Sequence, residues 1–522
     1  MSYSFIARLR PLFLLAFTAI LSAIVVQPGD LGSVDTYRRL QTTRSFWTSA
    51  PPVRPGDIGL VGRNGQLHYW YGMGQSLLML PADILARGSV RFVAHFREPP
   101  WWLMTEATIV SYITSTLVCT LAILVCFRFL RLLAFSVNQS IWGACSLLLG
   151  TTFLHYTQNL QENNLLLLLT LTGFRFQYDW FRSGSVRSLF GGSMALGANL
   201  LTRLPTGMDL LAAALFLFLC LWYENGRSRV TWNRLIQYGR ICIPCYAGFF
   251  IIDRLYQYYR FGSLFNTYLQ IYSKQFDGKI PGIAVHGPGW VWSTPFWQGF
   301  LGALITPEKS IFLFDPLIVL TLVLTFCLWK CLPSDMKAYV ITLGCLLLGY
   351  ISFYAKFFDW SGDYAWGDRY VTTPVQMLAL ISVPLLLRYG SALKGWVRGL
   401  GKAIVAASVA IQAASLFFLN SLEVWQLKTL GHPMFVIGLR FVNIIAFAFG
   451  MTDRWGLSNE YTRSSYKVTT PYFFPFLIMR QGTASSGKIV ILIVGWICLL
   501  IALLGSLFLI KIKSREYDRY ST

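Results

Sequence analysis

The sequence predicts an all-α polytopic membrane protein with about 12 transmembrane helices and both termini on the cytoplasmic side. Composition is the first observation: the 522 residues are 55% hydrophobic and only 13% charged, and their mean hydropathy is +0.52. A soluble chain of this size carries more charge. Apolar runs long enough to cross a bilayer and basic clusters between them are the second and third observations.

Apolar runs of spanning length recur along the whole chain. They lie near residues 11–27, 107–127, 137–155, 163–180, 188–202, 206–223, 240–257, 312–329, 339–356, 372–387, 401–419 and 488–510. We find no internal repeat and no pair of matched, glycine- or proline-broken helices of the kind that mark many transporters.

Basic residues fix the predicted orientation. With the N-terminus inside, every predicted inner loop contains Lys or Arg, as cytoplasmic loops usually do. These loops hold Arg8/Arg10, Arg128/Arg131, Arg182/Arg187, Arg227/Arg229/Arg234/Arg240, Lys330/Lys337, Arg388/Lys394/Arg398/Lys402 and Lys511/Lys513/Arg515. The net charge of +21 is therefore explained by topology, and we expect no nucleic-acid partner because the charge lies in short clusters between helices.

Four long outer segments remain: 28–106, 258–311, 357–371 and 420–487. They are rich in Trp, Tyr, Gly and Pro, which favours structured loops carrying interfacial helices. Segment 434–450 is apolar but interrupted by Arg440 and Asn443, so we interpret it as an interfacial helix, with a thirteenth span as the alternative. We divide the chain into a transmembrane core, 1–390, with the first three loops, and a C-terminal region, 391–522, with the fourth.

Two carboxylates follow directly on the first apolar run, in QPGDLGSVDTYRRL. Asp30 and Asp35 are placed within a few residues of the predicted outer membrane surface, beside Arg38 and Arg39. One interpretation is an acid at the start of a helix, where Asp is common. The other is a general base at the interface, which takes a proton from an incoming hydroxyl while a lipid-borne group waits in the bilayer.

Five strings, in this order, resemble motifs of the C-type membrane glycosyltransferase superfamily, which uses polyprenyl-phosphate sugars. The superfamily includes protein mannosyltransferases, lipid A aminoarabinose transferases and a bacterial RgtA-B-C-D-like branch. Two departures are Asn64, where the family usually has Asp, and Asp368, where it usually has Pro. The strings are GSVDTYRRL (32–40), GRNGQLHYWYGMGQSLLMLP (62–81), YYRFGSLFNTY (258–268), ITPEKSIFLFDP (305–316) and DWSGDYAWGDRYVTTP (359–374).

This resemblance covers residues 1 to about 390, so the transmembrane core is expected to be glycosyltransferase-like. It also implies a reaction. A sugar on a polyprenyl phosphate would be moved to a hydroxyl on the outer face, with inversion at the anomeric carbon. Asp35 would be the general base, by its match to the first-loop acid, and Asp30 the weaker choice. The phosphate gains charge as it leaves and needs cationic donors: Arg369 first, then Arg203 and Lys309. For Arg203 the alternative is an arginine that snorkels to the interface.

Further residues are assigned to substrate binding. Glu162, in HYTQNLQENN, is expected at the mouth of the cavity, to orient the acceptor or bind a cation; a helix-start acid is the alternative. Asp363 is the one acid beside Arg369 to which we assign a substrate role. Tyr69 and Tyr71 offer flat faces for sugar rings, or anchor the loop at the interface.

The sequence requires no cofactor and identifies no metal ligand set. Because some members of the superfamily hold a divalent metal near the first-loop acid, Mg²⁺ or Mn²⁺ remains compatible with Asp30, Asp35 and Glu162. The expected partners are a polyprenyl-phosphate sugar, the membrane, and a lipid, polysaccharide or protein acceptor. The expected location is the plasma (inner) membrane, with the site facing the periplasm.

Three other functions compete with this hypothesis. A transporter or flippase of lipid or polysaccharide would place polar residues at mid-membrane depth, whereas the acids and arginines here lie near the outer face. A non-catalytic subunit of an envelope assembly would tolerate the departures at Asn64 and Asp368. A polymerase or ligase of lipid-linked polysaccharide would rely on outer-loop Arg and His rather than on an Asp after the first helix.

Overall fold

Helices make up nearly all of the regular structure in a computed structural model of the chain. The structure describes residues 3–94, 105–280, 283–287, 289–419, 422–431, 435–451, 470–482 and 484–519. Within these ranges the only strands are β1 (Leu60–Val61) and β2 (Leu67–His68), which pair as a short antiparallel hairpin. The predicted all-α class is therefore confirmed for the described part. Segments 95–104 and 452–469, inside the predicted outer loops, lie outside it.

Each predicted apolar run coincides with one helix or with a broken pair. The single helices are α1 (Tyr3–Val26), α4 (Glu106–Leu132), α7 (Asn163–Ser183), α8 (Val186–Leu200), α9 (Gly207–Asn225), α10 (Arg229–Phe261), α14 (Leu317–Leu328), α15 (Ser334–Tyr354), α18 (Gly395–Ser415) and α23 (Ser486–Arg519). Run 137–155 is instead α5 (Val137–Gly150) followed by α6 (Phe153–Asn159). Run 372–387 is α16 (Thr372–Ala379) followed by α17 (Ser382–Tyr389).

Six described helices are long and apolar enough, by length and composition, to cross a membrane. They cover Glu106–Leu132, Leu204–Asn225, Arg229–Phe261, Ser334–Tyr354, Gly395–Ser415 and Ser486–Ser514. Some others are too short; α14, for example, has 12 residues, where a straight span needs about 20. The structure thus supports a membrane protein, and the count of about 12 spans stays a prediction.

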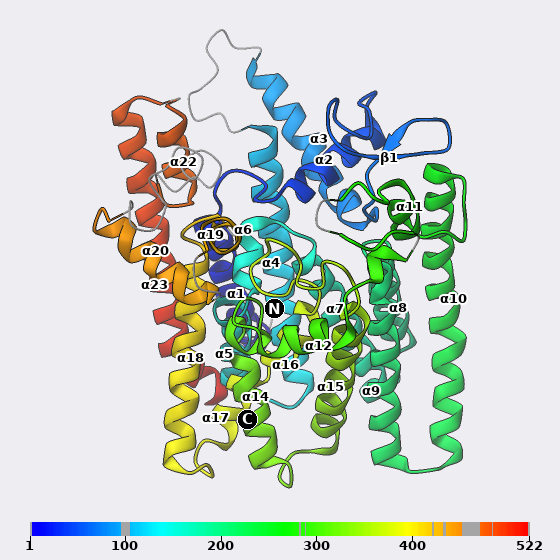
Figure 1. Cartoon of the computed structure of the whole chain (residues 1–522). Coiled ribbons are helices and arrows are strands. Elements are labelled where there is room, and N and C mark those ends of the chain that lie inside the picture. Colours follow the sequence, from blue (N-terminus) through cyan, green and yellow to red (C-terminus); the bar gives the residue numbers. More distant parts are fainter. Residues whose placement is uncertain are drawn as a thin grey trace.

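The predicted outer segments contain short elements. These are α2 (Val34–Trp47), α3 (Gly74–Ala94), α11 (Tyr268–Gln275), η2 (Trp290–Trp292), α12 (Phe296–Ile305), α19 (Leu422–Leu430), α20 (Val436–Ala448) and α22 (Phe474–Gln481). Two short elements lie elsewhere: η1 (Leu204–Thr206) precedes α9, and α13 (Ile311–Phe314) precedes α14 at the start of run 312–329. Figure 1 shows β1, α2, α3 and α11 together at one end of the long helices. The connections α9–α10, α14–α15 and α17–α18, which sequence analysis places inside, lie at the other end.

Helix α20 contains the two polar residues that interrupt its apolar sequence, and both serve a buried network. Arg440 is fully buried and pairs with the equally buried Glu423 of α19 at 2.6 Å. Its other donors reach the carbonyl oxygens of Ser415 and Phe418 at the end of α18. A buried charge needs such partners, so Arg440 ties α18, α19 and α20 together.

Candidate functional site

Asp35 lies in the first turn of α2, so the helix-start interpretation of this acid is met, and its role as a base stays a prediction. Ser33 caps the helix by accepting a hydrogen bond from the backbone N–H of Thr36 at 3.2 Å. An acid in the first turn is favoured by the helix dipole. Arg38 and Arg39 follow three and four residues later, on the same face as Asp35. One helix therefore presents a carboxylate and two guanidinium groups together.

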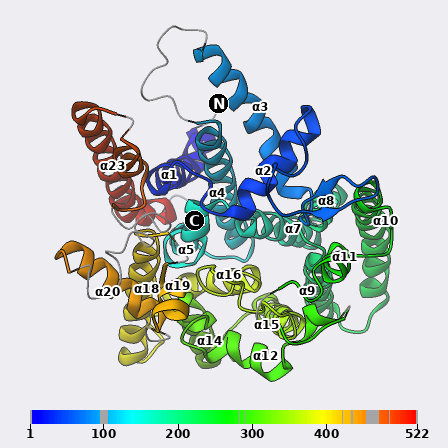
Figure 2. The ribbon, with the colours of Figure 1, turned by 45° about the horizontal axis from the view of Figure 1, so that its top comes forward.

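A cavity of about 740 Å³ receives these side chains. It is formed where α2, α11, the end of α15 and the loops before α7 and α16 meet; Figure 2 shows these helices around one region of the molecule. Six of the eight residues predicted for the site line the cavity. They are Asp35, Tyr71, Glu162, Arg203, Asp363 and Arg369.

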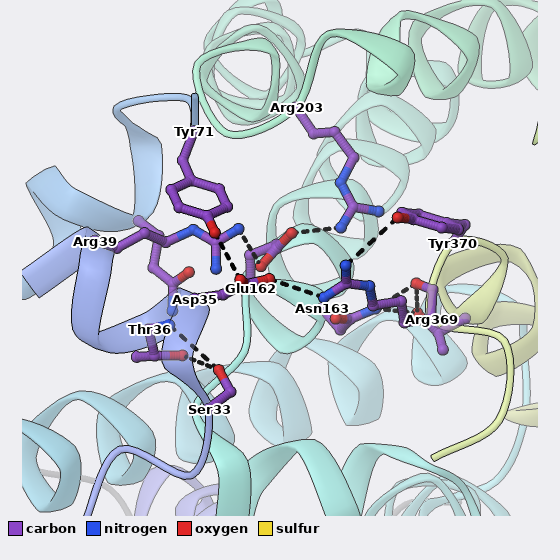
Figure 3. A network of polar contacts seen from close by, with 12 residues as sticks. Ser33, Asp35, Thr36, Arg39, Tyr71, Glu162, Asn163, Arg203, Arg369 and Tyr370 are labelled. Atoms are coloured by element: carbon purple, nitrogen blue, oxygen red, sulfur yellow. Dashed lines mark hydrogen bonds and ion pairs between the residues drawn. The ribbon is translucent and has the colours of Figure 1, made fainter. Parts of the chain in front are cut away.

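Asp35 is held between an arginine and a tyrosine, as Figure 3 shows. Its Oδ2 lies 2.9 Å from Nη1 of Arg369, and its Oδ1 accepts a hydrogen bond from the Tyr71 hydroxyl at 2.6 Å. Burial raises the pKa of Asp35, but the charges of Arg369 and Arg39 and the bond from Tyr71 outweigh it, so the pKa lies below its ordinary value. The carboxylate is thus ionised and oriented.

Glu162 lines the same cavity and is shared by two arginines. Its Oε2 lies 2.7 Å from Nη2 of Arg39, and its Oε1 accepts a hydrogen bond from Nη2 of Arg203 (Figure 3). Burial raises the pKa of Glu162, but the charges of Arg39, Arg203 and Arg369 outweigh it and lower the pKa well below its usual range. Glu162 therefore holds both arginines in position and remains charged.

The loop before α16 carries Arg369 and is braced from several sides. The ring of Tyr370 stacks on Tyr354 of α15 with centroids 4.3 Å apart, and Arg203 lies over the Tyr370 ring. Asn163 donates a hydrogen bond to the carbonyl oxygen of Arg369. At Gly362, where φ is +75°, an added Cβ would lie 2.7 Å from Cγ of Arg369. The guanidinium is therefore fixed by the backbone around it.

Two arginine donors at this cavity have no partner among the described residues. Nη1 of Arg39 and Nε of Arg369 are buried, and neither has a hydrogen-bond acceptor among those residues. Buried N–H groups normally find an acceptor, and an arginine donor suits the oxygen atoms of a phosphate. The lining includes five cations, Arg38, Arg39, Arg203, Arg369 and Lys428, and four acids, Asp35, Glu162, Asp359 and Asp363. This arrangement fits an anion.

The other predicted residues lie outside this cavity. The Tyr69 hydroxyl donates a hydrogen bond to Asp57 at 2.7 Å, and Tyr69 lines a separate, smaller cavity. Oδ1 of Asp30 accepts hydrogen bonds from the backbone of Gly32 and from the Tyr472 hydroxyl. Asn64 is exposed in the turn between β1 and β2. Tyr69 thus supports the loop that carries Tyr71.

Lys309 is buried behind the cavity rather than in its wall. Its Nζ donates hydrogen bonds to the carbonyl oxygens of Asp363 and Ala365, each at 2.7 Å, and reaches that of Gly367 at 3.4 Å. Burial lowers the pKa of Lys309 to about 8. Where the sequence suggested a phosphate contact, the structure shows a lysine that holds the loop leading to Arg369.

Replacing Lys309 with Met is therefore expected to loosen residues 363–367. The carbonyl oxygens lose a charged donor, which costs about 3 kcal/mol, so the melting temperature in detergent should fall and amide hydrogen exchange at 363–367 should rise. Lys356→Met is the matched control, because Lys356 is an exposed lysine of the same loop. Unchanged exchange in Lys309→Met would contradict this role.

Several residues that line the cavity were not assigned to the site from the sequence. Arg39 pairs with Glu162, and its spacing of four residues from Asp35 on a helix would have identified it. Asp359 lines the cavity although, of the acids beside Arg369, only Asp363 was assigned a substrate role from the sequence. Tyr268 and Tyr354 also line it, but nothing in the local sequence distinguishes them from the many interfacial tyrosines.

The carboxylates here do not fit a metal ion well. Asp35 and Glu162 are each bound by arginine, which competes with a cation for the same oxygens. Among the described residues, no group of three or more His, Cys, Asp or Glu side chains is placed to hold a metal. A dependence on Mg²⁺ or Mn²⁺ stays a prediction.

An apolar cavity adjoins the charged one. It has a volume of about 570 Å³ and lies between α9 and α10, lined by leucines and by Met208, Ile243 and Tyr246. Pro205 and Phe353 line both cavities. Both α9 and α10 belong to the helices that are apolar and long enough to cross a membrane, so this cavity is placed to receive a hydrocarbon chain.

Comparison with known proteins finds a distant structural likeness. No family model and no curated protein matches the sequence. Among solved structures, the chain is similar to the crystal structure of ArnT from Cupriavidus metallidurans, in which that protein is bound to undecaprenyl phosphate. The two share 11% sequence identity with a TM-score of 0.42, over 84% of this chain and 78% of ArnT. A likeness at this level carries no conclusion about activity.

Proposed function

We propose that this protein is a membrane glycosyltransferase that moves a sugar from a polyprenyl-phosphate donor to an acceptor hydroxyl on the periplasmic face of the inner membrane. One observation carries the proposal: the ionised Asp35 shares a cavity with Arg39, Arg203 and Arg369, and two of these arginines have buried, unpaired donors. A base and an anion site thus meet at one place. Of these residues, Asp35, Arg39 and Arg369 lie in sequence motifs that resemble those of the C-type superfamily.

The arginines would hold the phosphate of the donor. As the bond between the anomeric carbon and the phosphate oxygen breaks, a phosphodiester becomes a monoester and gains negative charge. Donors that are already in place stabilise that charge most effectively. Arg39 and Arg203 are fixed by Glu162, and Arg369 by Asp35, so little reorganisation is needed.

Asp35 would act on the acceptor. Its carboxylate accepts the proton of the attacking hydroxyl, the hydroxyl oxygen forms a bond to the anomeric carbon, and polyprenyl phosphate leaves with the electron pair of the broken bond. A single displacement of this kind inverts the anomeric configuration. Arg369 and Tyr71 orient the carboxylate, which general base catalysis requires.

The adjoining apolar cavity supports a lipid-borne donor over a soluble one. A phosphate bound at Arg203 would place its chain next to Pro205 and Phe353, which line both cavities. From there a hydrocarbon chain can follow the groove between α9 and α10. Burial of apolar chain there contributes roughly 0.8 kcal/mol per methylene, which a free sugar phosphate cannot gain.

Native mass spectrometry of the purified protein tests this recognition without knowledge of the sugar. We expect undecaprenyl phosphate to bind, and undecaprenol, which lacks the phosphate, to bind at least tenfold more weakly. Equal binding of the two lipids would contradict an anion site at the arginines. The double variant Arg203→Met/Arg369→Met should bind both lipids alike.

Donor binding should weaken as the pH rises through about 6. Asp359 lines the cavity, and burial raises its pKa to about 6. Above this pH the carboxyl is charged and repels the phosphate; below it, the carboxyl is neutral. We expect the Kd of a polyprenyl-phosphate glucose, a diester of constant charge, to rise about fivefold between about pH 5 and about pH 8.

Asp359→Asn removes this dependence if Asp359 is its source. The amide is neutral at every pH, so the variant should bind the diester with one affinity over the whole range, close to that of the wild type at low pH. Isothermal titration in detergent provides the Kd values. A wild type without pH dependence, or an unchanged dependence in Asp359→Asn, would contradict the role of this carboxyl.

A further inference from the structure

A second, smaller cavity touches the other side of the Asp35–Arg369 ion pair. Its volume is about 310 Å³, within the range of small-ligand sites, and Asp35, Asp363 and Arg369 line both it and the large cavity. The first turn of α2, with Ser33 and Val34, forms another part of its wall. The ion pair that contains the proposed base is therefore reachable from two cavities.

A buried, unpaired amide oxygen lies in the wall of the small cavity. Gln161 is 5% exposed, and its Oε1 has no hydrogen-bond partner among the described residues. The preceding Leu160 has φ of +44°, which ends α6 and turns the chain. Gln161 then lines the small cavity while its neighbour Glu162 lines the large one. An amide in this position suits a hydroxyl group.

The two cavities differ in charge. The large one has five cations in its wall, whereas the described lining of the small one contains a single cation, Arg369, which is already paired with Asp35. Its other charged group is the carboxylate of Asp363. An anionic ligand would lose its hydration there without gaining a free cation. An uncharged ligand with hydroxyl groups has no charge to dehydrate, so it avoids this cost.

We propose that the small cavity is the acceptor site and that it takes an uncharged, hydroxyl-bearing sugar unit. This inference rests on the proposed function and adds the acceptor class to it. Gln161 positions the sugar, and one of the sugar's hydroxyls meets Asp35 from the side of the small cavity. An inverting displacement needs the nucleophile and the leaving phosphate on opposite sides of the anomeric carbon, and two cavities that share Asp35 and Arg369 supply those two sides.

Binding of glycans, measured apart from transfer, tests the proposal. Envelope glycans are hydrolysed to oligosaccharides and separated into a neutral and an acidic pool, and each is added to the full-length protein saturated with undecaprenyl phosphate. Saturation-transfer NMR should show binding of the neutral pool only. Gln161→Leu should weaken that binding about tenfold, and Val34→Trp, which fills the cavity from an exposed position of α2, should abolish it.

Val61→Trp is the matched control. Val61 is an exposed valine of strand β1, as Val34 is of α2, and it lines neither the large cavity, nor the apolar cavity, nor the small cavity. It should bind the neutral pool as the wild type does. Binding of the acidic pool in place of the neutral one, or unchanged binding in Val34→Trp, overturns the inference. Binding of undecaprenyl phosphate, measured in the same samples, separates the two proposals. A wild type that does not bind this lipid contradicts the donor site. Loss of lipid binding in Val34→Trp alone shows that the small cavity holds the lipid, and it overturns the acceptor site.

Discussion

Asp35→Asn is expected to lower sugar transfer by about 10²- to 10⁴-fold, the range for loss of a general base. The amide keeps the shape of the side chain and can still accept a hydrogen bond from Arg369 or Tyr71, so the fold and the cavity should persist. It cannot take the proton of the acceptor hydroxyl. Binding of undecaprenyl phosphate should remain within about threefold of the wild type, because the arginines that face the phosphate are unchanged.

Asp30→Asn is the matched control for this variant. Asp30 lies five residues earlier, accepts hydrogen bonds from Gly32 and Tyr472 and does not line the large cavity. Transfer from a polyprenyl-phosphate sugar, followed by the release of polyprenyl phosphate, should be near normal in Asp30→Asn. Full transfer by Asp35→Asn would remove Asp35 as the base, and loss in Asp30→Asn alone would assign the base to Asp30.

Arg369→Met should have the next largest effect. The change removes a charged donor whose Nε has no partner among the residues that the structure describes, and also the ion-pair partner of Asp35. A hydrogen bond to a charged group contributes about 1.5–3 kcal/mol, so the Kd for undecaprenyl phosphate should rise about tenfold to a hundredfold. The value of kcat/KM should fall further, since the phosphate gains charge in the transition state.

Two comparisons separate a lost phosphate contact from a general loss of charge. Arg63→Met removes an exposed arginine of the β1–β2 hairpin that does not line the cavity, and it should bind the lipid normally. Arg369→Lys keeps the charge but not the fork of donors, so it should recover part of the binding. An Arg369→Met protein that binds undecaprenyl phosphate as the wild type does would refute the anion site.

The positions of the helices could be predicted because an apolar run is a feature of the local sequence. Apolar runs set the positions of α4 and α9 closely, and a bilayer-length run is a strong signal. Helix α10 begins at Arg229, well before the predicted run 240–257. The break between α16 and α17 was not predicted, because Leu380 and Ile381 at that turn are as apolar as the run around them. The break between α5 and α6 is at Thr151 and Thr152, where Thr152 donates hydrogen bonds to the distant Asp315. The buried pair of Arg440 and Glu423 was missed since its partners come from separate helices.

The site was predictable only in part for a similar reason. The family motifs gave Asp35 and Arg369, and the polar cluster around Glu162 and the position of Arg203 at the end of a predicted span gave those two residues; all four line the cavity. They did not give the direction of each side chain. Lys309 points at backbone carbonyl oxygens behind the loop, a placement that depends on how segment 359–374 folds back and that no local pattern records.

The most direct test of the central claim is release of polyprenyl phosphate by purified protein. The wild type and Asp35→Asn in nanodiscs are given a panel of polyprenyl-phosphate sugars together with an envelope extract that contains acceptors, and the released lipid phosphate is quantified. We predict that the wild type consumes at least one donor and that Asp35→Asn, which binds the lipid equally, consumes it about 10²-fold more slowly or less. A folded wild type that binds undecaprenyl phosphate but consumes no donor would contradict a transferase and favour a carrier or assembly subunit.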